Sequence, residues 1–254
     1  TSADIAAEKE LKKNLLKIIP SSGFIGEEEY ASNQNILKSY QEDNYCWTVD
    51  PIDGTTNFVK GRDKFAIMIA LTKKDQILES ALALLVEKGI HATPMSAIAK
   101  KAKTGMGTIY NYFPTKEDLI NEIYVNIKVK EMHVLLQFDE HAPIKTQFES
   151  FYKNMVTFFL QRPDYFYFME QLQASPMINE ASKMKGEKAI ACGIQLIETG
   201  KQNRIIKNIE TEEIIQFLGG AVMSFIRWQL NQNKKSNTQA LNNHLEMVWS
   251  AIKE

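Results

Sequence analysis

The fold of most of this chain is decided by one stretch of sequence, which reads Gly107-Thr108-Ile109-Tyr110-Asn111-Tyr112-Phe113-Pro114-Thr115-Lys116-Glu117. Ile109 and Phe113 are four residues apart, which is the spacing of one helix face, and Pro114 ends the helix. Thr115 begins the next helix, with Asp118 in the acidic position of a capping box. The stretch therefore predicts a short helix followed closely by another.

Two helices are predicted just before this stretch. The first has an apolar face and stops at Gly89, a natural helix terminator; that face is formed by Ile77, Leu78, Ala81, Leu82 and Leu85. The second starts with Thr93 as its N-cap and Pro94 in its first turn, and it runs to Ala102. A tight turn at Thr104-Gly105 follows. Compact helices joined in this way are typical of a helix-turn-helix bundle.

The rest of the chain divides into two kinds of pattern. Towards the carboxyl end we expect helices at about 115–139, 144–161, 164–173, 177–199, 211–231 and 237–253, separated by prolines, Gly200 and a polar stretch. Towards the amino end, a helix at 3–18 is followed by strand-like runs at 46–49 and 65–71. The fold is therefore expected to be mainly all-α, with a small α+β segment in front of it.

Charge and composition restrict the classes of function. The net charge is −1, but residues 1–72 carry −3, residues 73–130 carry +3 and the remainder −1, so a modestly basic module lies in the middle. No apolar run approaches the roughly 20 residues that span a bilayer, and no signal-peptide pattern is visible, so we expect no membrane partner. Cys46 and Cys192 have no metal-binding spacing and are expected to be buried free thiols in a reducing cytoplasm.

The decisive stretch, with Met95-Ser96-Ala97-Ile98-Ala99 and Glu87-Lys88-Gly89 before it, closely resembles the TetR family of transcriptional regulators. The resemblance implies a helix-turn-helix DNA-binding domain over 72–122 and a helical effector-binding and dimerisation domain over 123–254. One departure is that Lys103 and Gly105 stand where the family more often has Gly and Ser. We expect no cofactor for such a regulator.

The predicted DNA-binding residues are drawn from the turn, the two short helices and the start of the next helix. Gly105 and Gly107 let the backbone approach DNA, and lysines attract phosphates. The full set is Thr93, Lys103, Gly105, Gly107, Thr108, Tyr110, Asn111, Tyr112 and Lys116. Phe113 is expected in the core, and the alternative that Tyr110 and Tyr112 also belong to an aromatic core stripe stays open at this point.

The resemblance also implies a homodimer and a small ligand. Two copies would read a palindromic operator, and the dimer face is expected on the last two long helices. The effector is expected to be apolar or aromatic, because the central helices are dense in aromatic residues; its predicted pocket is formed by Phe151, Phe158, Phe159, Tyr165 and Phe168. Ligand binding is expected to release DNA, so the chain is predicted to be a repressor, with activation as the open alternative.

A second motif lies near the amino end and reads Trp47-Thr48-Val49-Asp50-Pro51-Ile52-Asp53-Gly54-Thr55-Thr56-Asn57-Phe58. Together with Gly26-Glu27-Glu28 and Thr1-Ser2-Ala3-Asp4, it resembles the inositol monophosphatase family over residues 1–71. The resemblance implies Mg²⁺ ligands at Asp4, Glu27, Asp50, the Ile52 carbonyl and Asp53, because hard oxygen donors suit Mg²⁺. It also implies that Thr55 positions a water molecule for attack on a phosphate ester.

The phosphatase-like segment is expected to be incomplete. The family's later Trp-Asp motif has no counterpart, since Trp47, Trp228 and Trp249 are followed by Thr, Gln and Ser. An Mg²⁺-dependent phosphomonoesterase is therefore the alternative function, and the sequence favours a regulator that is not an enzyme. How the two segments came to be joined is left open by the sequence.

Overall fold

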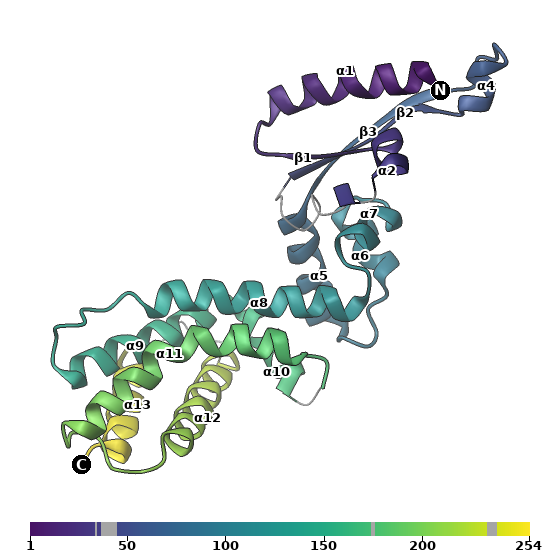
Figure 1. The fold of residues 1–254 in the computed structure, drawn as a ribbon. Helices are drawn as coiled ribbons and strands as arrows, with labels where there is room; N and C mark the ends of the chain where they lie inside the picture. Colours follow the sequence, from purple (N-terminus) through teal and green to yellow (C-terminus); the bar gives the residue numbers. More distant parts are fainter. Residues whose placement is uncertain (34, 37–44, 174–175, 233–237) are drawn as a thin grey trace. The chain divides into compact units, whose positions relative to one another are not determined.

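The computed structural model describes residues 1–33, 35–36, 45–173, 176–232 and 238–254 (Figure 1). The chain forms two compact units, Thr1–Leu119 and Ile120–Glu254. Residues 1–71 and 72–122 were expected as separate domains, whereas one unit holds both the strands and the helix-turn-helix. The division falls inside a continuous helix, α8 (Lys116–Leu135).

The strands of the first unit form a small mixed sheet in the order β1-β2-β3. β1 (Gly23–Gly26) lies parallel to β2 (Tyr45–Asp53), with Gly23 opposite Cys46, and β3 (Ala66–Lys73) lies antiparallel to β2, with Tyr45 opposite Lys73. β2 is longer than predicted because it pairs on both sides. β1 was not predicted, since a strand of four residues that begins and ends with glycine is too short to show a period-two pattern.

One face of the sheet is covered by α1 (Ser2–Ile18), as Figure 1 shows. Leu15 of the helix packs with Phe24 and Val49 of the sheet in a small apolar core. β3 is the outer strand on its side, and apolar side chains at Ile67, Met68, Ile69 and Leu71 are exposed. The described part of the sheet is therefore covered by a helix but has an apolar outer strand.

The helix-turn-helix is built from α5 (Lys74–Lys88), α6 (Met95–Ala102) and α7 (Met106–Tyr112). The predicted apolar face of α5 is buried, and the helix ends before Gly89, whose φ of 88° suits glycine. Asp118 and Thr115 form the predicted reciprocal cap, with backbone N to side-chain oxygen distances of 3.0 Å in each direction. The predicted N-cap of α6 was wrong, since Pro94 occupies that position instead of Thr93.

The described part of the second unit consists of helices joined by turns and loops, with one isolated β-bridge between Ile206 and Lys253. After residues 120–135 of α8 come α9 (Ile144–Gln161), α10 (Pro163–Gln173), α11 (Glu180–Gln202), α12 (Thr211–Leu230) and α13 (Thr238–Ile252). α9 packs against α10, α11, α12 and α13, so it is the central helix of the unit. None of the described helices has the length and apolarity needed to cross a bilayer.

A short helix, α4 (Thr55–Val59), completes the first unit together with α2 (Glu27–Ser32). α4 follows Gly54, which has a φ of 88° and a Cβ position only 2.9 Å from the Lys64 carbonyl oxygen. A side chain there would meet both a strained backbone and a neighbouring chain segment. The glycine therefore fixes the turn that follows the acidic end of β2.

Candidate functional site

The DNA-reading surface expected from the sequence lies on α7 and on the turn before it. Tyr110 is 45% exposed, Asn111 and Gly107 are exposed, and Thr108 is half-buried. No atom beyond Gly107's own neighbours lies within 4 Å of its Cβ position, so the backbone there is open to a close approach. Gly105 is also exposed and is the N-cap of α7. These four residues of α7 and the glycine before them share an accessible region.

Lysines surround the turn between α6 and α7. Lys103 is exposed and adopts the left-handed conformation, with φ 54° and ψ 40°. Lys100 and Lys101, which the sequence reasoning did not select, are also exposed in the last turn of α6. Three lysines within four residues were the signal that could have identified them. Their positive charge is suited to attracting DNA phosphates.

Two residues predicted to touch DNA lie in the core instead. Tyr112 is only 4% exposed, and its hydroxyl donates to the Thr72 carbonyl oxygen at 3.4 Å. Thr93 is fully buried, and its hydroxyl lies 2.9 Å from the Gly89 carbonyl oxygen and 3.2 Å from that of Leu84. The predicted DNA contacts of Tyr112 and Thr93 are therefore wrong in this structure. Tyr112 follows Ile109 by three residues, which places both on the inner face of α7.

Lys116 is half-buried at the start of α8. Its ammonium group donates to the Ile90 carbonyl oxygen, and burial lowers the pKa of Lys116. The side chain is thus engaged with the protein, and a phosphate contact would require it to leave Ile90. Lys103 is better placed for that role.

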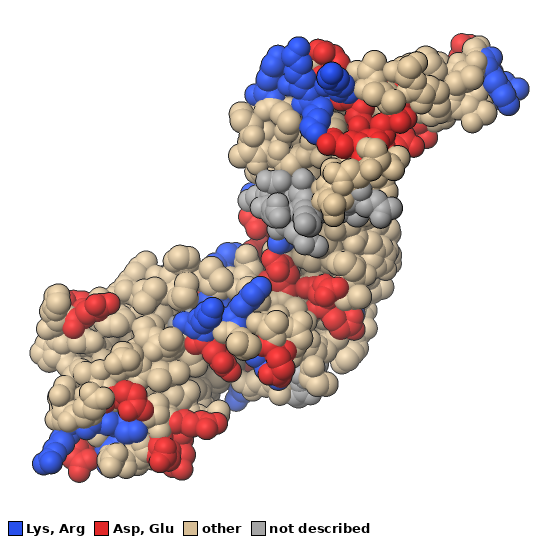
Figure 2. All heavy atoms as spheres, in the orientation of Figure 1, with Lys and Arg blue, Asp and Glu red and all other residues tan. Residues whose placement is uncertain are grey.

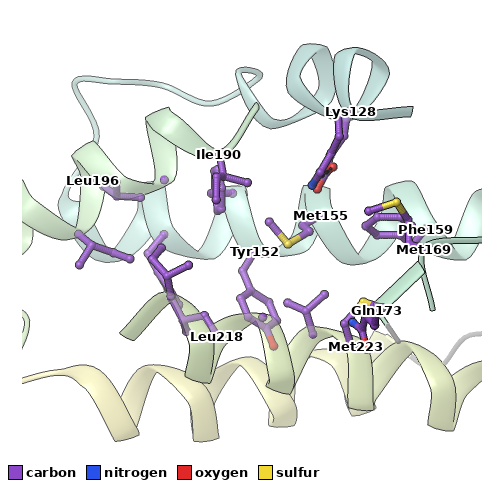
Figure 3. A pocket seen from close by; sticks show the side chains of 18 residues that line it. Lys128, Tyr152, Met155, Phe159, Met169, Gln173, Ile190, Leu196, Leu218 and Met223 are labelled. Carbon is purple, nitrogen blue, oxygen red and sulfur yellow. Dashed lines mark hydrogen bonds and ion pairs between the residues drawn. The ribbon is translucent and has the colours of Figure 1, made fainter. Parts of the chain in front are cut away.

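The second unit contains an apolar cavity of about 220 Å³. Its wall is drawn from α8, α9, α10, α11 and α12 (Figure 3). The lining residues are Lys128, Glu131, Phe148, Phe151, Tyr152, Met155, Phe159, Met169, Gln173, Ile190, Gly193, Leu196, Ile197, Ile215, Leu218, Gly219, Val222 and Met223. A cavity walled almost entirely by apolar side chains with a few polar groups is the usual form of a small-molecule site.

The cavity contains part of the aromatic set predicted for it. Phe151 and Phe159 line the wall, whereas Phe158, Tyr165 and Phe168 do not. Those three are buried in the packing of α9 and α10, where the Phe158 and Tyr165 ring centroids are 5.6 Å apart. The prediction was wrong for them because aromatic density along a sequence does not say which face of a helix each ring occupies.

Sequence reasoning missed the contribution of α12. Ile215, Leu218 and Val222 line the cavity, although the sequence suggested them for a dimer face. Gly193 permits α11 to approach α9, since its Cβ position is 2.6 Å from the Phe151 ring. The i, i+3, i+7 spacing of the α12 residues showed an apolar face but not what the face packs against.

One polar contact ties the cavity wall to the last helix. The Tyr152 hydroxyl and His244 Nε2 on α13 are 2.8 Å apart. Burial raises the pKa of Tyr152 and lowers that of His244. At neutral pH both groups are thus uncharged, and the Tyr152 hydroxyl is already committed to a partner within the protein.

The phosphatase-like carboxylates are only partly brought together. Glu27 and Asp50 share a hydrogen bond, and the pKa of Glu27 is raised by burial first and then by the negative charge of Asp50. Asp4 instead accepts hydrogen bonds from the Thr1 hydroxyl and amino group, while Asp53 is exposed at the end of β2. The Ile52 carbonyl oxygen accepts from the Thr55 hydroxyl at 2.9 Å.

These residues do not form the expected Mg²⁺ site. Within the described part of the chain, no group of three or more His, Cys, Asp or Glu side chains is arranged to hold a metal ion. Figure 2 shows acidic side chains gathered around α2, which carries Glu27, Glu28 and Glu29. The cluster thus supplies negative charge but not the convergent ligands that Mg²⁺ requires.

A second cavity is lined by both the Glu27–Asp50 pair and a residue of α7. It has a volume of about 240 Å³ and lies within the first unit. Glu27, Asp50 and Asn111 all line it. The predicted DNA-contacting Asn111 is therefore next to two acidic side chains, an arrangement that the sequence did not indicate.

Comparisons with known proteins match both parts of the chain. Residues 1–162 match the model of the inositol monophosphatase family, and residues 143–253 match the tetracyclin repressor-like, C-terminal domain. The first match extends far beyond the last strand at Lys73, although residues 74–162 contain helices and no strand. The sheet therefore ends well before the matched region does.

Individual relatives show the same division. Inositol-1-monophosphatase of Rhizobium meliloti is 38% identical over 78 residues, which are 31% of this chain and 27% of that protein. The HTH-type transcriptional regulator YhgD of Bacillus subtilis is 41% identical over 64 residues, which are 25% of this chain and 33% of that protein. The chain thus spans about a quarter to a third of the curated relatives that it matches.

Solved structures resemble the helical part. A TetR family transcription regulator from Shewanella sp. PV-4 has a TM-score of 0.66 at 20% identity, covering 71% of this chain and 98% of that one. A TetR-family regulator from Haemophilus influenzae has a TM-score of 0.58 at 19% identity, covering 71% and 96%. The carboxy-terminal region matches the tetracyclin repressor-like, C-terminal domain and has the TetR fold, and the chain belongs to the inositol monophosphatase family through its amino-terminal match.

Proposed function

We propose that the chain is a homodimeric, ligand-responsive transcriptional regulator that represses by binding a palindromic operator. The observation that carries the proposal is an apolar cavity in a tetracyclin repressor-like domain, in a chain that also has a helix-turn-helix. Proteins that share this fold include transcriptional regulators from Shewanella and Haemophilus influenzae.

DNA binding is assigned to the exposed part of α7 and the lysines before it. Tyr110, Asn111 and Thr108 lie on or near the surface of α7 and carry groups that reach base edges or phosphates. Lys100, Lys101 and Lys103 are exposed and supply positive charge. α7 has seven residues and can make few base contacts, so two copies of the chain are needed to specify a DNA site.

The homodimer is assigned to α12 and α13. Phe217 and Trp228 on α12 are 47% and 48% exposed, and Met247 on α13 is 64% exposed. Phe217, Gly220, Ser224 and Trp228 recur at the spacing of one helix face, and the small residues between the rings permit close approach. Large apolar side chains on one face are typical of a protein–protein interface.

The effector is assigned to the cavity of the second unit. Its wall is apolar, and three methionines allow it to adapt to ligand shape. FadR from Bacillus subtilis, a structural neighbour with a TM-score of 0.59 and 21% identity, was solved in complex with stearoyl-CoA. That example supports a ligand with a long apolar chain for a protein of this fold. Binding would favour a dimer whose reading helices no longer match the operator spacing.

The proposal is tested by selecting bound fragments from source genomic DNA and footprinting them across a salt series. We expect one palindromic site whose affinity falls steeply with salt. Tyr110→Ala is expected to abolish the footprint, whereas Tyr167→Ala is the matched control, because Tyr167 is an exposed tyrosine on α10. Recovery of no site by the unmodified chain, or equal loss in both variants, would count against the proposal.

The alternative is an Mg²⁺-dependent phosphomonoesterase of the inositol monophosphatase type. The pairing of Glu27 with Asp50 is the observation in its favour, but the remaining expected ligands do not converge on that pair. Release of phosphate from inositol monophosphate that requires Mg²⁺ and is lost in Asp50→Asn would establish this activity. We expect no such release above the level seen with the variant.

A further inference from the structure

The cavity of the second unit contains one ion pair in a mostly apolar wall. Lys128 Nζ and Glu131 Oε2 are 2.8 Å apart, and their side chains are 15% and 3% exposed. The two residues are one turn apart on α8, and Figure 3 shows Lys128 pointing from its helix towards the interior. Removing both charges from water costs free energy that their attraction often fails to return, so stability alone does not explain the pair.

The pair has hydrogen-bonding capacity to offer a ligand. A lysine ammonium carries three donors, and the contact with Glu131 uses one of them. The Tyr152 hydroxyl, another polar group on the wall, is already bound to His244. Gln173 supplies an amide, and Figure 3 places it on the side of the cavity away from Leu196 and Leu218. The polar groups that can meet a ligand are therefore few.

Charge balance decides which head group fits. Lys128 and Glu131 neutralise one another, so a ligand with a net charge would bring an uncompensated charge into an apolar cavity. A neutral oxygen acceptor avoids that cost, because it takes an N–H from Lys128 and leaves the ion pair intact. The phenylalanine and methionine side chains at Phe151, Phe159, Met155, Met169 and Met223 suit an apolar body.

We propose that the cavity selects uncharged amphiphiles, with an apolar body and one neutral oxygen-bearing head group that accepts a hydrogen bond from Lys128. Alcohols, ketones, esters and amides have this chemistry, whereas fatty acids and alkylamines do not at neutral pH. The inference rests on the proposed function in one respect, which is that this cavity is the effector site.

The test is isothermal titration calorimetry of the full chain at pH 7.5 with three probes of equal chain length. Decan-1-ol is neutral, decanoate is an anion and decylammonium is a cation. The two ions are used below their critical micelle concentrations, and decan-1-ol is used below its solubility limit. We expect decan-1-ol to bind at least about tenfold more tightly than either ion, because each ion brings a charge that the neutral Lys128–Glu131 pair does not compensate.

A double variant tests the role of the pair. Lys128→Met/Glu131→Leu replaces both charges with apolar side chains of similar size, an exchange that buried pairs often tolerate. It is expected to bind decan-1-ol about tenfold more weakly than the unmodified chain. The matched control is Lys201→Met/Glu198→Leu, because Lys201 and Glu198 are also three residues apart, form an ion pair at 3.5 Å and do not line the cavity. The control is expected to bind as the unmodified chain does.

The outcomes separate this inference from the proposed function. Tightest binding of decanoate or decylammonium, binding of none of the probes, or unchanged decan-1-ol affinity in Lys128→Met/Glu131→Leu would overturn it. None of these measurements involves DNA, so an operator footprint can be found while the inference fails. Equally, the expected selectivity with no operator would uphold the ligand class and overturn the regulator.

Discussion

At the scale of single residues, Tyr110 and Tyr112 are two positions apart on α7 yet have opposite environments. Tyr110 is exposed, whereas Tyr112 is buried with its hydroxyl directed at Thr72. Side chains two residues apart point in directions that differ by about 200° around the helix axis, so one ring faces out when the other faces in. Only Tyr110 is available to DNA in this structure.

We therefore expect Tyr112→Phe to affect stability and not DNA binding. Loss of the hydroxyl removes the bond to the Thr72 carbonyl and lowers the free energy of unfolding by about 1 kcal/mol. Urea denaturation measures stability, and operator titration measures DNA binding. Tyr110→Phe is the matched control, which is expected to weaken DNA binding and leave stability unchanged. A large loss of operator affinity in Tyr112→Phe at unchanged stability would place that hydroxyl on DNA after all.

Lys103 combines a strained backbone with a charge near the reading helix. Its left-handed conformation costs an L-residue about 1 kcal/mol relative to glycine. Lys103→Gly is accordingly expected to raise the free energy of unfolding by about that amount. The same change removes a positive charge, so the slope of log affinity against log salt concentration is expected to become shallower by about one.

Lys100→Gly is the matched control for this prediction. Lys100 is also exposed, but it lies inside α6, where glycine costs about 1 kcal/mol of stability. Both variants are expected to lose a similar part of the salt dependence while moving stability in opposite directions. Chemical denaturation with a salt series of operator titrations distinguishes them, and destabilisation by Lys103→Gly would refute the strain argument.

At the scale of elements, α12 has two apolar faces with different partners. Val222 and Leu218 face the cavity, while Phe217 and Trp228 are exposed. A helix that is apolar on both faces is expected to be covered on both. The outer face is the one assigned to the dimer.

Phe217→Lys is expected to weaken the homodimer by about thirtyfold or more, since it places a charge among apolar side chains of the interface. Met184→Lys is the control, because Met184 is an exposed apolar residue on α11. Sedimentation equilibrium measures the dissociation constant. If Phe217→Lys dimerises as strongly as Met184→Lys does, the dimer lies elsewhere.

At the scale of the whole molecule, the first unit joins the sheet to the helix-turn-helix. The sheet brings an apolar outer strand, β3, and the acidic pair at Glu27 and Asp50 beside Asn111. Negative charge near α7 opposes the approach of DNA phosphates. An outer strand with exposed apolar side chains also favours pairing with other chains.

The segment 72–254 is therefore expected to recognise the same operator as the full chain. It retains α5, α6 and α7 and loses a segment with a net charge of −3. Its affinity at low salt is expected to be several-fold higher, with less self-association. Footprinting and light scattering measure these effects, and circular dichroism checks that the helices are retained. Loss of the operator by a folded 72–254 segment would show that residues 1–71 are needed for recognition.

Local sequence patterns were sufficient to predict most elements. The apolar face of α5, the stop at Gly89 and the Thr115–Asp118 cap follow from interactions within a few residues, and the structure bears each of them out. The change from strands to helices near Lys73 was also visible, because period and turn residues are local. These properties depend on neighbours in the chain.

Only the tertiary structure decided which side chains share a site. Phe151 and Phe159 reach the cavity while Phe158 and Phe168 do not, and Glu27 meets Asp50 but not a full set of ligands. The Lys128–Glu131 pair lies in a mostly apolar cavity because α9 to α12 supply the rest of the wall. Neither residue's position in the sequence indicates that environment. The sequence determined helices and their faces, because hydrogen bonds and periodicity act locally, whereas burial and charge environment depend on residues that are distant along the chain.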